Sequence, residues 1–369
     1  MADTGRLVAF YGAGEPMRIE EYPVPDPEPG AIVVRTTLAN VCGSDLHVWR
    51  GDQDLKKMGR ALPRHLGHEQ CGMIHKLGDG VTTDSMGAPL AVGDRVIFRY
   101  AFACGRCRAC LTGRTRCCPN QMRHTATPCN VWPYFKGAWG DYSYLPAGHV
   151  VLKVPDVLTD GMVAGINCAF STVMCGVDVA RIELGETVVV QGAGGLGIFA
   201  AAAARELGAG KVIVVDGIQE RLDLAAAFGA DALIDLRELK TVEARVQRVR
   251  DLTDGWGADV VVEVAGVIGA MNEALQMLGN GGRLVEIGNI VAGTSFDLAP
   301  TTLNQRNVSI LGVGYYEAAH LQRSLDLMLR RREQYPFDKI VSDIFPLEEV
   351  ENVLAEQNKG HITRAALKP

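Results

Sequence analysis

The pattern of apolar and polar residues in this 369-residue chain changes near residue 185. Before that point, short apolar runs such as 31–36 and 95–98 are separated by turns rich in proline and glycine, including PVPDPEPG at 23–30. Short apolar runs bounded by such turns predict β-strands. We therefore expect residues 1–150 to be rich in β-structure.

From about residue 185, strand-like runs alternate with helical stretches. The expected strands are ETVVV (186–190), KVIVVD (211–216), DVVVEVAG (259–266) and GRLVEIG (282–288), with helical segments such as GIFAAAAARELG, ERLDLAAAFGA and MNEALQML between them. This alternation predicts right-handed βαβ units and a parallel sheet. The rhythm stops near residue 312, where a helical segment, HLQRSLDLMLRRRE, and a mixed tail follow.

Composition and charge exclude several classes of partner. Lysine and arginine total 37 against 43 aspartate and glutamate, a net charge of −6, so no basic surplus attracts nucleic acid or an anionic membrane. No apolar run approaches the roughly 18–20 residues that span a bilayer; the best candidate is 196–204. The N-terminus shows no secretory signal, so we expect a cytoplasmic protein. Its ten cysteines are then metal ligands or core thiols rather than disulfides.

A glycine-rich turn follows the strand ETVVV. Gly192, Gly194, Gly195, Leu196 and Gly197 form the pattern GxGxxG between a strand and a helix. The first glycine permits a tight turn, the second lets a pyrophosphate approach the backbone, and the third allows close packing of helix and strand. The helix N-terminus then faces the phosphates. The pattern predicts a dinucleotide site.

Asp216 ends the next expected strand, 19 residues after Gly197. An acidic residue at this place accepts hydrogen bonds from ribose hydroxyls and repels a 2′-phosphate. The sequence therefore favours NAD over NADP.

Four cysteines lie within 15 residues, at positions Cys104, Cys107, Cys110 and Cys118. Four thiolates so spaced can close a tetrahedral shell, which indicates a structural zinc. Other residues of ligand type are dispersed: Cys42 in CGSDLH, His68 and Glu69 in GHE, and Cys168 in NCAFST. Three ligands and an open fourth position are typical of a catalytic zinc, but spacing alone does not link these residues.

With these motifs the chain resembles the zinc-dependent alcohol dehydrogenases of the medium-chain dehydrogenase/reductase superfamily. The matching segments are CGSDLH (42–47), GHEQCG (67–72), VGDRV (92–96), the four-cysteine segment, NCAFST (167–172), QGAGGLG (191–197) and ITRAALKP (362–369). They occur in the family's order, and the resemblance covers essentially the whole chain.

The resemblance implies a catalytic zinc held by Cys42, His68 and Cys168. It places Glu69 close behind the metal, or visiting it. It also implies that Asp45 is a carboxylate that orients His68, as carboxylates commonly do for zinc-binding histidines.

Further roles are implied for the reaction and the cofactor. Ser44 and His47 match the family's proton-relay positions, and histidine is suited to exchange protons near neutral pH. Arg221 would flank the adenosine ribose, and Arg364 would reach the pyrophosphate from the tail. The implied activity is reversible oxidation of an alcohol to an aldehyde or ketone, with hydride transfer to NAD.

The implied fold class is α/β with two domains. Residues 1–169 and 313–369 would form a discontinuous, β-rich, GroES-like catalytic domain carrying two zinc ions. Residues 170–312 would form a Rossmann-like coenzyme domain with a doubly wound parallel sheet. The implied partners are a small alcohol or carbonyl substrate and further copies of the chain, as a homodimer or homotetramer joined near the edge strand 308–312. Neither nucleic acid nor a membrane is expected as a partner.

Other functions make different predictions. A non-enzymatic NAD-binding zinc protein would lose catalytic ligands, and a zinc-free quinone or enoyl reductase would lack the four-cysteine segment. The sequence matches neither. The alternative that stays open is a polyol or amino-alcohol dehydrogenase, similar to those that act on sorbitol or threonine.

The substrate depends on the aromatic residues Trp132, Tyr134, Phe135 and Trp139, with Trp49 and Tyr100 as further candidates. If the cluster lines the pocket, the expected alcohol is bulky and apolar, and secondary or cyclic, since a polyol needs more polar partners. The same cluster is also compatible with a core or a subunit interface.

Overall fold

The computed structural model describes residues 3–122, 125–360 and 362–369, which form two compact units. Unit 1 contains Met1–Cys168, Glu317–Arg332 and Phe337–Pro369, and unit 2 contains Ala169–Tyr316 and Glu333–Pro336. The expected division differs by giving residue 169 and the segments 313–316 and 333–336 to the first domain. The segment 333–336 belongs to unit 2 because Tyr335 stacks on Phe228 and its hydroxyl donates to Glu206 Oε1 at 2.9 Å.

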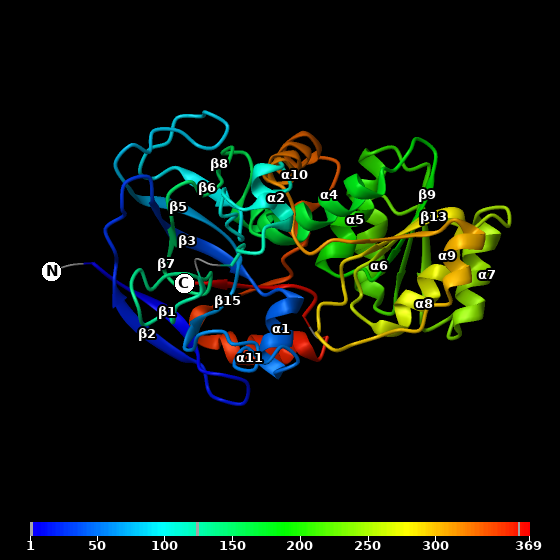
Figure 1. The fold of residues 1–369 in the computed structure, drawn as a ribbon, viewed down its shortest axis with the longest axis horizontal. Coiled ribbons are helices and arrows are strands. Elements are labelled where there is room, and N and C mark those ends of the chain that lie inside the picture. The colour runs from blue at the N-terminus through cyan, green and yellow to red at the C-terminus, as the bar shows by residue number, and fades with distance from the viewer. Residues whose placement is uncertain (1–2, 123–124, 361) are drawn as a thin grey trace. The chain divides into compact units, whose positions relative to one another are not determined.

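Unit 1 is built on two sheets (Figure 1). The small sheet has the order β2-β1-β4, and the large sheet has the order β15-β16-β3-β5-β6-β8, with β7 also paired to β3. The strands are β1 (Thr4–Phe10), β2 (Arg18–Pro23), β3 (Ile32–Asn40), β4 (Arg64–His65), β5 (Glu69–Leu77), β6 (Arg95–Phe98), β7 (Tyr142–Leu145), β8 (Val151–Lys153), β15 (Asp343–Pro346) and β16 (Ala365–Lys368).

The helices of unit 1 are short, apart from two near its C-terminal part. They are α1 (Gly43–Arg50), α2 (Arg108–Leu111), η1 (Thr115–Cys117), α3 (Asp160–Val163), α10 (Ala318–Arg331), η4 (Phe337–Lys339), η5 (Leu347–Glu349) and α11 (Val350–Asn358). The turn η3 (Ile166–Phe170) continues into α4 (Ser171–Ala180) of unit 2.

The C-terminal tail closes the core of unit 1. Strand β16 pairs antiparallel with β3, so that Ala366 lies opposite Asn40. Leu367 and residues of α11 pack with Val8 of β1 and with Trp139, which is fully buried. The first and last segments of the chain therefore share one apolar core, which is why this domain is discontinuous.

Unit 2 contains a six-stranded sheet with the order β11-β10-β9-β12-β13-β14, in which every pairing is parallel. The strands are β9 (Thr187–Gln191), β10 (Lys211–Asp216), β11 (Ala232–Asp235), β12 (Ala258–Glu263), β13 (Leu278–Glu286) and β14 (Ser309–Gly312). The strand order reverses between β9 and β12, which makes the sheet doubly wound. This confirms the predicted mixed fold, with a β-rich part and a parallel-sheet part.

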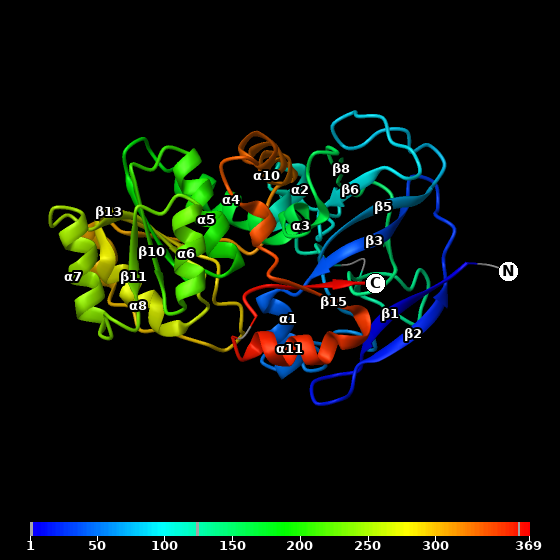
Figure 2. The ribbon, with the colours of Figure 1, turned by 180° about the vertical axis from the view of Figure 1, so that it is seen from behind.

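Helices cover both faces of this sheet (Figure 2). Helices α4, α5 and α6 lie on one face and α7, α8 and α9 on the other. Their bounds are α5 (Gly195–Glu206), α6 (Gln219–Ala227), α7 (Val242–Leu252), α8 (Ile268–Met277) and α9 (Pro300–Arg306). The sequence missed β11 because this strand has four residues, of which only Ile234 is buried.

One helical stretch corrects the expectation that no segment reaches spanning length. Residues Asp160–Ala180 are long and apolar enough to cross a membrane by length and composition, in the part of the chain that the structure describes. Of its most apolar window, 83% is buried. A buried core helix of a soluble protein satisfies the same criteria, so the absence of a membrane partner stays a prediction.

Candidate metal centres and cofactor site

Ligand atoms from three distant segments meet in unit 1. The Sγ atoms of Cys42 and Cys168, a ring nitrogen of His68 and a carboxylate oxygen of Glu69 all lie within 4.8 Å of one another. His68 Nε2 lies 3.3 Å from Cys168 Sγ, although 100 positions separate the two residues. The fold thus brings the predicted catalytic ligands into one cluster.

The first turn of α1 fixes Cys42 and Asp45. Cys42 is the N-cap of the helix, and its backbone N–H donates to Asp45 Oδ2 at 2.9 Å. The other oxygen, Oδ1, lies 3.3 Å from His68 Nδ1. Because Asp45 is buried, its carboxylate favours a proton on Nδ1 and leaves Nε2 to face the sulfur atoms.

A tight turn before β5 presents His68. Gly67 has a φ of +77°, and a Cβ atom there would lie 2.4 Å from Trp139 Cδ1. Only glycine satisfies both the left-handed backbone and the close approach. The glycine of the GHE motif is therefore required by packing.

Asn167 ties the third ligand to the second. Its Nδ2 donates to the carbonyl of His68 at 2.9 Å, and its Oδ1 accepts from the backbone N–H of Gln70 at 3.3 Å. Cys168 follows directly, within η3, a π-type turn of the kind often found at functional sites. No motif in the sequence predicts a role for Asn167. What points to a role is that Asn167 is completely buried next to the ligand Cys168, and burial cannot be read from the sequence.

The charges of this cluster favour a cation. A hydrogen bond from Cys168 is the largest cause that holds the pKa of Cys42 well below its usual value, against the opposing effect of burial. Burial lowers the pKa of His68, but Asp45 and Cys42 outweigh it and raise that pKa to about 10. Two thiolates and one imidazole are a donor set that zinc prefers, with a fourth position open. The residues therefore fit zinc.

Glu69 lies in this cluster but has a second partner. Its Oε2 forms an ion pair with Arg364, and both side chains are buried. Its Oε1 has no hydrogen-bond partner among the described residues. One oxygen is thus held by Arg364, while the other makes no hydrogen bond in the described part of the chain.

Arg364 was expected to reach the cofactor pyrophosphate, and the structure gives it a different partner. It directly precedes β16, whose pairing with β3 places it beside Glu69 at the start of β5. Arg364 is only 4% exposed, and burial lowers the pKa of its guanidinium. A buried carboxylate within reach explains the ion pair.

The four-cysteine segment forms a second cluster in unit 1. The Sγ atoms of Cys104, Cys107, Cys110 and Cys118 all lie within 4.8 Å of one another. Cys107 and Cys110 are 3.5 Å apart, and Cys104 and Cys118 are 3.6 Å apart. A tetrahedral zinc with Zn–S bonds of about 2.3 Å separates its ligands by about 3.8 Å, so these thiols fit zinc. Cys117 is exposed and outside the group.

The two expected relay residues lie on α1. His47 Nδ1 lies 2.9 Å from Asp52 Oδ2, and its Nε2 has no hydrogen-bond partner among the described residues. Within the same residues the hydroxyl of Ser44 makes no hydrogen bond. Both atoms are therefore available to a ligand. No direct contact joins Ser44 to His47 in the described part of the chain.

The glycine turn of unit 2 has the geometry of a phosphate site. Gly192 has a φ of +95°, and a Cβ on Gly197 would lie 1.7 Å from the carbonyl oxygen of Gly192. Gly194 is the N-cap of α5, and a Cβ there would meet nothing within 4 Å. Gly195 and Leu196 form the first turn of this helix. The first turn of a helix leaves backbone amides without partners inside the helix, which is the arrangement an anion site requires.

Asp216 is fixed at the end of β10. Its Oδ2 accepts from Ala193 N at 2.7 Å, and its Oδ1 accepts from Gly217 N at 2.8 Å and from Ile218 N at 2.9 Å. The carboxylate is thus held beside the glycine turn, and its oxygens retain lone pairs for ribose hydroxyls. Arg221 lies in the first turn of α6, and its buried Nε has no hydrogen-bond partner among the described residues.

The structure divides the aromatic residues. Phe135 and Trp139 are fully buried in the core of unit 1, and Tyr134 stacks on Tyr22 at 4.9 Å between ring centroids. Trp132 differs, since it is 45% exposed and its ring centroid lies 5.3 Å from that of Tyr144. Three of the four residues thus pack in the core of unit 1, and the cluster gives no support for an apolar substrate pocket. Tyr100 remains beside the metal cluster, with its ring centroid 5.1 Å from that of His68.

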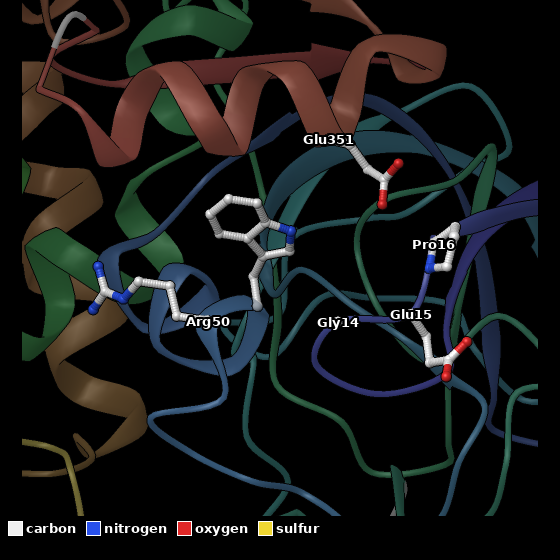
Figure 3. A pocket seen from close by; sticks show the side chains of 6 residues that line it. Gly14, Glu15, Pro16, Arg50 and Glu351 are labelled. Atoms are coloured by element: carbon white, nitrogen blue, oxygen red, sulfur yellow. The ribbon is translucent and has the colours of Figure 1, made fainter.

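Trp49 also lies away from the ligand cluster. It lines a pocket of about 450 Å³, together with Gly14, Glu15, Pro16, Arg50 and Glu351, and none of the metal-ligand residues lines this pocket. Figure 3 shows Glu15, Pro16 and Glu351 gathered on one side of this pocket, while Arg50 points away from them. The expectation that Trp49 faces the substrate has no support from this placement.

Two families match successive parts of the chain. Residues 28–156 match the alcohol dehydrogenase GroES-like domain, and residues 195–330 match zinc-binding dehydrogenase. The 5-exo-hydroxycamphor dehydrogenase of Pseudomonas putida is 34% identical over 360 residues, 96% of either chain. The L-threonine 3-dehydrogenase of Rhizobium etli (strain CIAT 652) is 31% identical over 315 residues, which are 84% of this chain and 85% of that one.

Solved structures show the same architecture. Alcohol dehydrogenase from Thermotoga maritima is 28% identical and superimposes over 100% of both chains with a TM-score of 0.91. A zinc-binding dehydrogenase from Sinorhizobium meliloti 1021, solved with NADP bound, is 25% identical and covers 100% of both chains with a TM-score of 0.85.

Proposed function

Since the chain belongs to the zinc-dependent alcohol dehydrogenase family of the medium-chain dehydrogenase/reductase superfamily, we propose that it oxidises a bulky, apolar, secondary or cyclic alcohol reversibly to the ketone. Members of this family are oxidoreductases that use zinc and NAD(P). We further propose that this chain uses NAD and binds two zinc ions.

One observation carries the proposal: Cys42, His68 and Cys168 meet with Asp45 behind the histidine. A non-enzymatic relative has no need of this arrangement. A zinc-free reductase has no need of the second, four-cysteine cluster either. The complete donor sets therefore favour a catalyst.

In the proposed reaction each residue has a defined task. When bound, zinc lowers the pKa of the alcohol and NAD accepts the hydride. Cys42, His68 and Cys168 hold the metal and leave one position open, while Asp45 keeps the proton on His68 Nδ1. The alcohol proton leaves by way of Ser44, and His47 accepts it at Nε2, the nitrogen without a partner.

The choice of NAD rests on Asp216. Its carboxylate stands at the end of β10, held by three backbone amides, and meets a 2′-phosphate with like charge. Arg221 is close in sequence, but no ion pair joins it to Asp216 in the described part of the chain. A relative from Sinorhizobium meliloti 1021 binds NADP, so the preference of this chain for NAD is to be tested by comparing kcat/KM with the two cofactors.

The substrate class rests on two observations. Tyr100 places an aromatic ring beside His68, and the relative that acts on 5-exo-hydroxycamphor matches 96% of the chain. A rigid bicyclic secondary alcohol combines apolar bulk with one hydroxyl, which suits an aromatic wall beside a metal.

A panel of alcohols tests this proposal. With NAD, we expect bicyclic and cyclic secondary alcohols to give kcat/KM values at least about 100-fold above those of ethanol, sorbitol and threonine. The reason is that the cyclic alcohols bury more apolar surface when they bind. The variant Cys168→Ala should lose activity toward all of them, while Cys175→Ala, a buried cysteine outside both clusters, should retain it. Preference for sorbitol or threonine would contradict the proposed substrate class.

We also propose that the protein acts in the cytoplasm as a homodimer or homotetramer. Strand β14 is the edge of the parallel sheet, and an edge strand presents unpaired backbone groups to a second copy.

A further inference from the structure

The relay histidine has two competing partners on one nitrogen. Asp52 Oδ2 lies 2.9 Å from His47 Nδ1, and Arg50 Nη2 lies 2.9 Å from the same atom. A guanidinium only donates hydrogen bonds, and an ionised carboxylate only accepts them. Nδ1 can therefore donate to Asp52 or accept from Arg50, but not both at once.

The two partners also hold each other. Arg50 Nε and Nη2 donate to Asp52 Oδ2 at 2.9 Å and 2.6 Å. Arg50 Nη1 donates to Asn358 Oδ1 of α11 at 2.6 Å, which anchors the guanidinium to a second helix. Arg50, and after it His47, hold the pKa of the Asp52 carboxyl below its usual range. The carboxylate is thus a fixed negative charge.

The backbone is shaped to bring Asp52 back to the helix. Gly51 ends α1 with a φ of +85°, and a Cβ there would lie 2.9 Å from Ala13 Cβ. Glycine is the residue that takes this left-handed conformation without strain. The turn therefore returns the chain so that Asp52 faces His47.

This geometry serves either neutral form of the histidine. With the proton on Nδ1, the ring donates to Asp52. With the proton on Nε2, Nδ1 accepts from Arg50. Neither form loses its hydrogen bond on this side, so the energetic difference between the two forms is small. A histidine that passes a proton through its ring needs access to both forms.

We propose that Arg50 and Asp52 are positioning residues that let His47 take up the alcohol proton at Nε2 and release the proton on Nδ1 to solvent. The inference rests on the proposed function, since it assumes that His47 accepts this proton. Nε2 gains the proton and the ring becomes an imidazolium, which Asp52 stabilises. Nδ1 then loses its proton to water, and Arg50 donates to the vacated nitrogen. One proton enters, one leaves, and no electron is transferred. Exchange of the ring protons with water then restores the Nδ1–H form for the next turnover.

Few other groups bear on His47. Among the described residues of unit 1, Arg50 and Asp52 are the charged groups that contact its ring. From α11, Asn358 is neutral, Glu356 pairs with Lys359, and Glu351 accepts from the backbone N–H of Met17. Asp45 faces His68 instead. The balance at His47 is therefore one positive charge against one negative charge.

Single variants should disturb this balance in opposite directions. The test records kcat/KM for alcohol oxidation against pH, and His47→Gln identifies the inflection that belongs to His47. Asp52→Asn removes the negative charge and should move this inflection to lower pH by about 0.5–1 unit. Arg50→Gln removes the positive charge and should move it to higher pH by a similar amount. The double variant should return close to the wild type.

A second readout avoids turnover. The chain has eight histidines, so ¹⁵N-histidine labelling and comparison with His47→Gln assigns the His47 ring signals in the zinc-loaded protein. Wild type should show both neutral tautomers in exchange, Asp52→Asn a population shifted toward the Nε2–H form, and Arg50→Gln toward the Nδ1–H form. Asp235→Asn is the matched control, because it breaks an Arg–Asp pair of the same spacing, with Arg237, in unit 2.

The outcomes distinguish the role of His47 as proton acceptor from the role of Arg50 and Asp52 in positioning it. An inactive wild type, or a His47→Gln profile identical to the wild type, would overturn the relay itself. A normal His47 inflection that neither single variant moves, or that both move in the same direction, would overturn the role of Arg50 and Asp52 alone. We expect the single variants to keep the thermal unfolding and zinc content of the wild type. If they change only the melting temperature, Arg50 and Asp52 stabilise the fold and do not position His47.

Discussion

At the scale of single residues, Asp45 shows how one carboxylate can serve both a fold and a metal site. One oxygen caps the backbone of Cys42, and the other faces the ring of His68. The two ligands are thereby held in fixed relation before any metal binds. Asp45 can form this link because it is the third residue of α1, and the side chain at that position lies close to the backbone of the N-cap, here Cys42.

Asp216 carries the prediction on cofactor choice. Asp216→Asn keeps the size of the side chain and removes its charge, so repulsion of a 2′-phosphate is lost. We expect the ratio of kcat/KM for NAD over NADP to fall by about 10- to 100-fold, corresponding to one charge-assisted contact. Comparable kcat/KM values for NAD and NADP in the wild type would already contradict the assignment.

Asp216→Ala is the matched comparison for this prediction. It also removes the acceptor for Ala193 N in the glycine turn, so KM should rise for both cofactors. Asparagine keeps one of the two acceptor oxygens, so its KM values should rise less than those of the alanine variant. The change in the NAD/NADP ratio that both variants share then reports the charge.

Some residues follow from local pattern, and others do not. The glycines of the phosphate turn and the four cysteines are close in sequence, so spacing alone predicts their task. The partner of Arg364, the burial of Trp139 and the role of Asn167 depend on strands that pair across much of the chain. A single sequence does not contain the register of β16 on β3, so these contacts could not be predicted.

At the scale of elements, the four-cysteine segment is a lobe with little apolar core of its own. Its helices α2 and η1 have four and three residues, and neither contains a buried residue. Metal binding must therefore supply most of its order. This makes the lobe sensitive to the loss of one ligand.

Cys118→Ala tests the lobe. We expect metal analysis to give two zinc ions per chain in the wild type and one in the variant, with faster proteolysis within 104–118. Cys117→Ala, which changes the exposed neighbouring cysteine, should retain both ions. A wild type with one zinc, unchanged by Cys118→Ala, would remove the structural site from the account.

Two carboxylates meet at the ends of β12 and β13 in unit 2. Glu263 is fully buried, and Asn289 Nδ2 donates to both Glu263 Oε2, at 3.0 Å, and Glu286 Oε1, at 3.2 Å. Burial, and then the charge of Glu286, raise the pKa of Glu263 to about 7. The pair therefore holds a proton in the folded state that the unfolded chain releases near pH 4.5.

This pair predicts a pH dependence of stability. A raised carboxyl pKa stabilises the folded state fully below pH 4.5, and this contribution is lost as pH rises to about 7. Glu263→Gln should flatten the dependence, and above pH 7 it should exceed the wild type by on the order of 1–3 kcal/mol. Urea unfolding of unit 2, followed from pH 5 to 8, measures it. Parallel curves for wild type and variant would contradict the raised pKa.

At the scale of the whole molecule, the order of elements explains how far the fold was predictable. The alternation after residue 185 predicted the parallel sheet, because βαβ units are local in sequence. The discontinuous unit 1 was expected only through family resemblance, since nothing in the tail shows that β16 returns to β3. The excursion of 333–336 into unit 2, through Tyr335, was missed for the same reason.

The edge of the parallel sheet carries the prediction on assembly. Among the strands that the structure describes, β14 (Ser309–Gly312) pairs with β13 alone, so its outer side can accept a second copy. We expect light scattering to give a dimer or tetramer of the 39.7-kDa chain at micromolar concentration. Ile310→Pro should shift the population toward monomer, because proline removes a backbone donor. A stable wild-type monomer would refute this assembly.

The central claim is that the cluster of Cys42, His68 and Cys168 holds the zinc at which an alcohol transfers hydride to NAD. The most direct measurement uses a cyclic secondary alcohol deuterated at its carbinol carbon and mass spectrometry of the reduced cofactor. The account predicts one deuterium per molecule of NADH from the wild type, loss of transfer after a chelator removes the zinc, and recovery when zinc is returned. Deuterium transfer at an unchanged rate in the zinc-depleted protein, or NADH formed without deuterium, would contradict it.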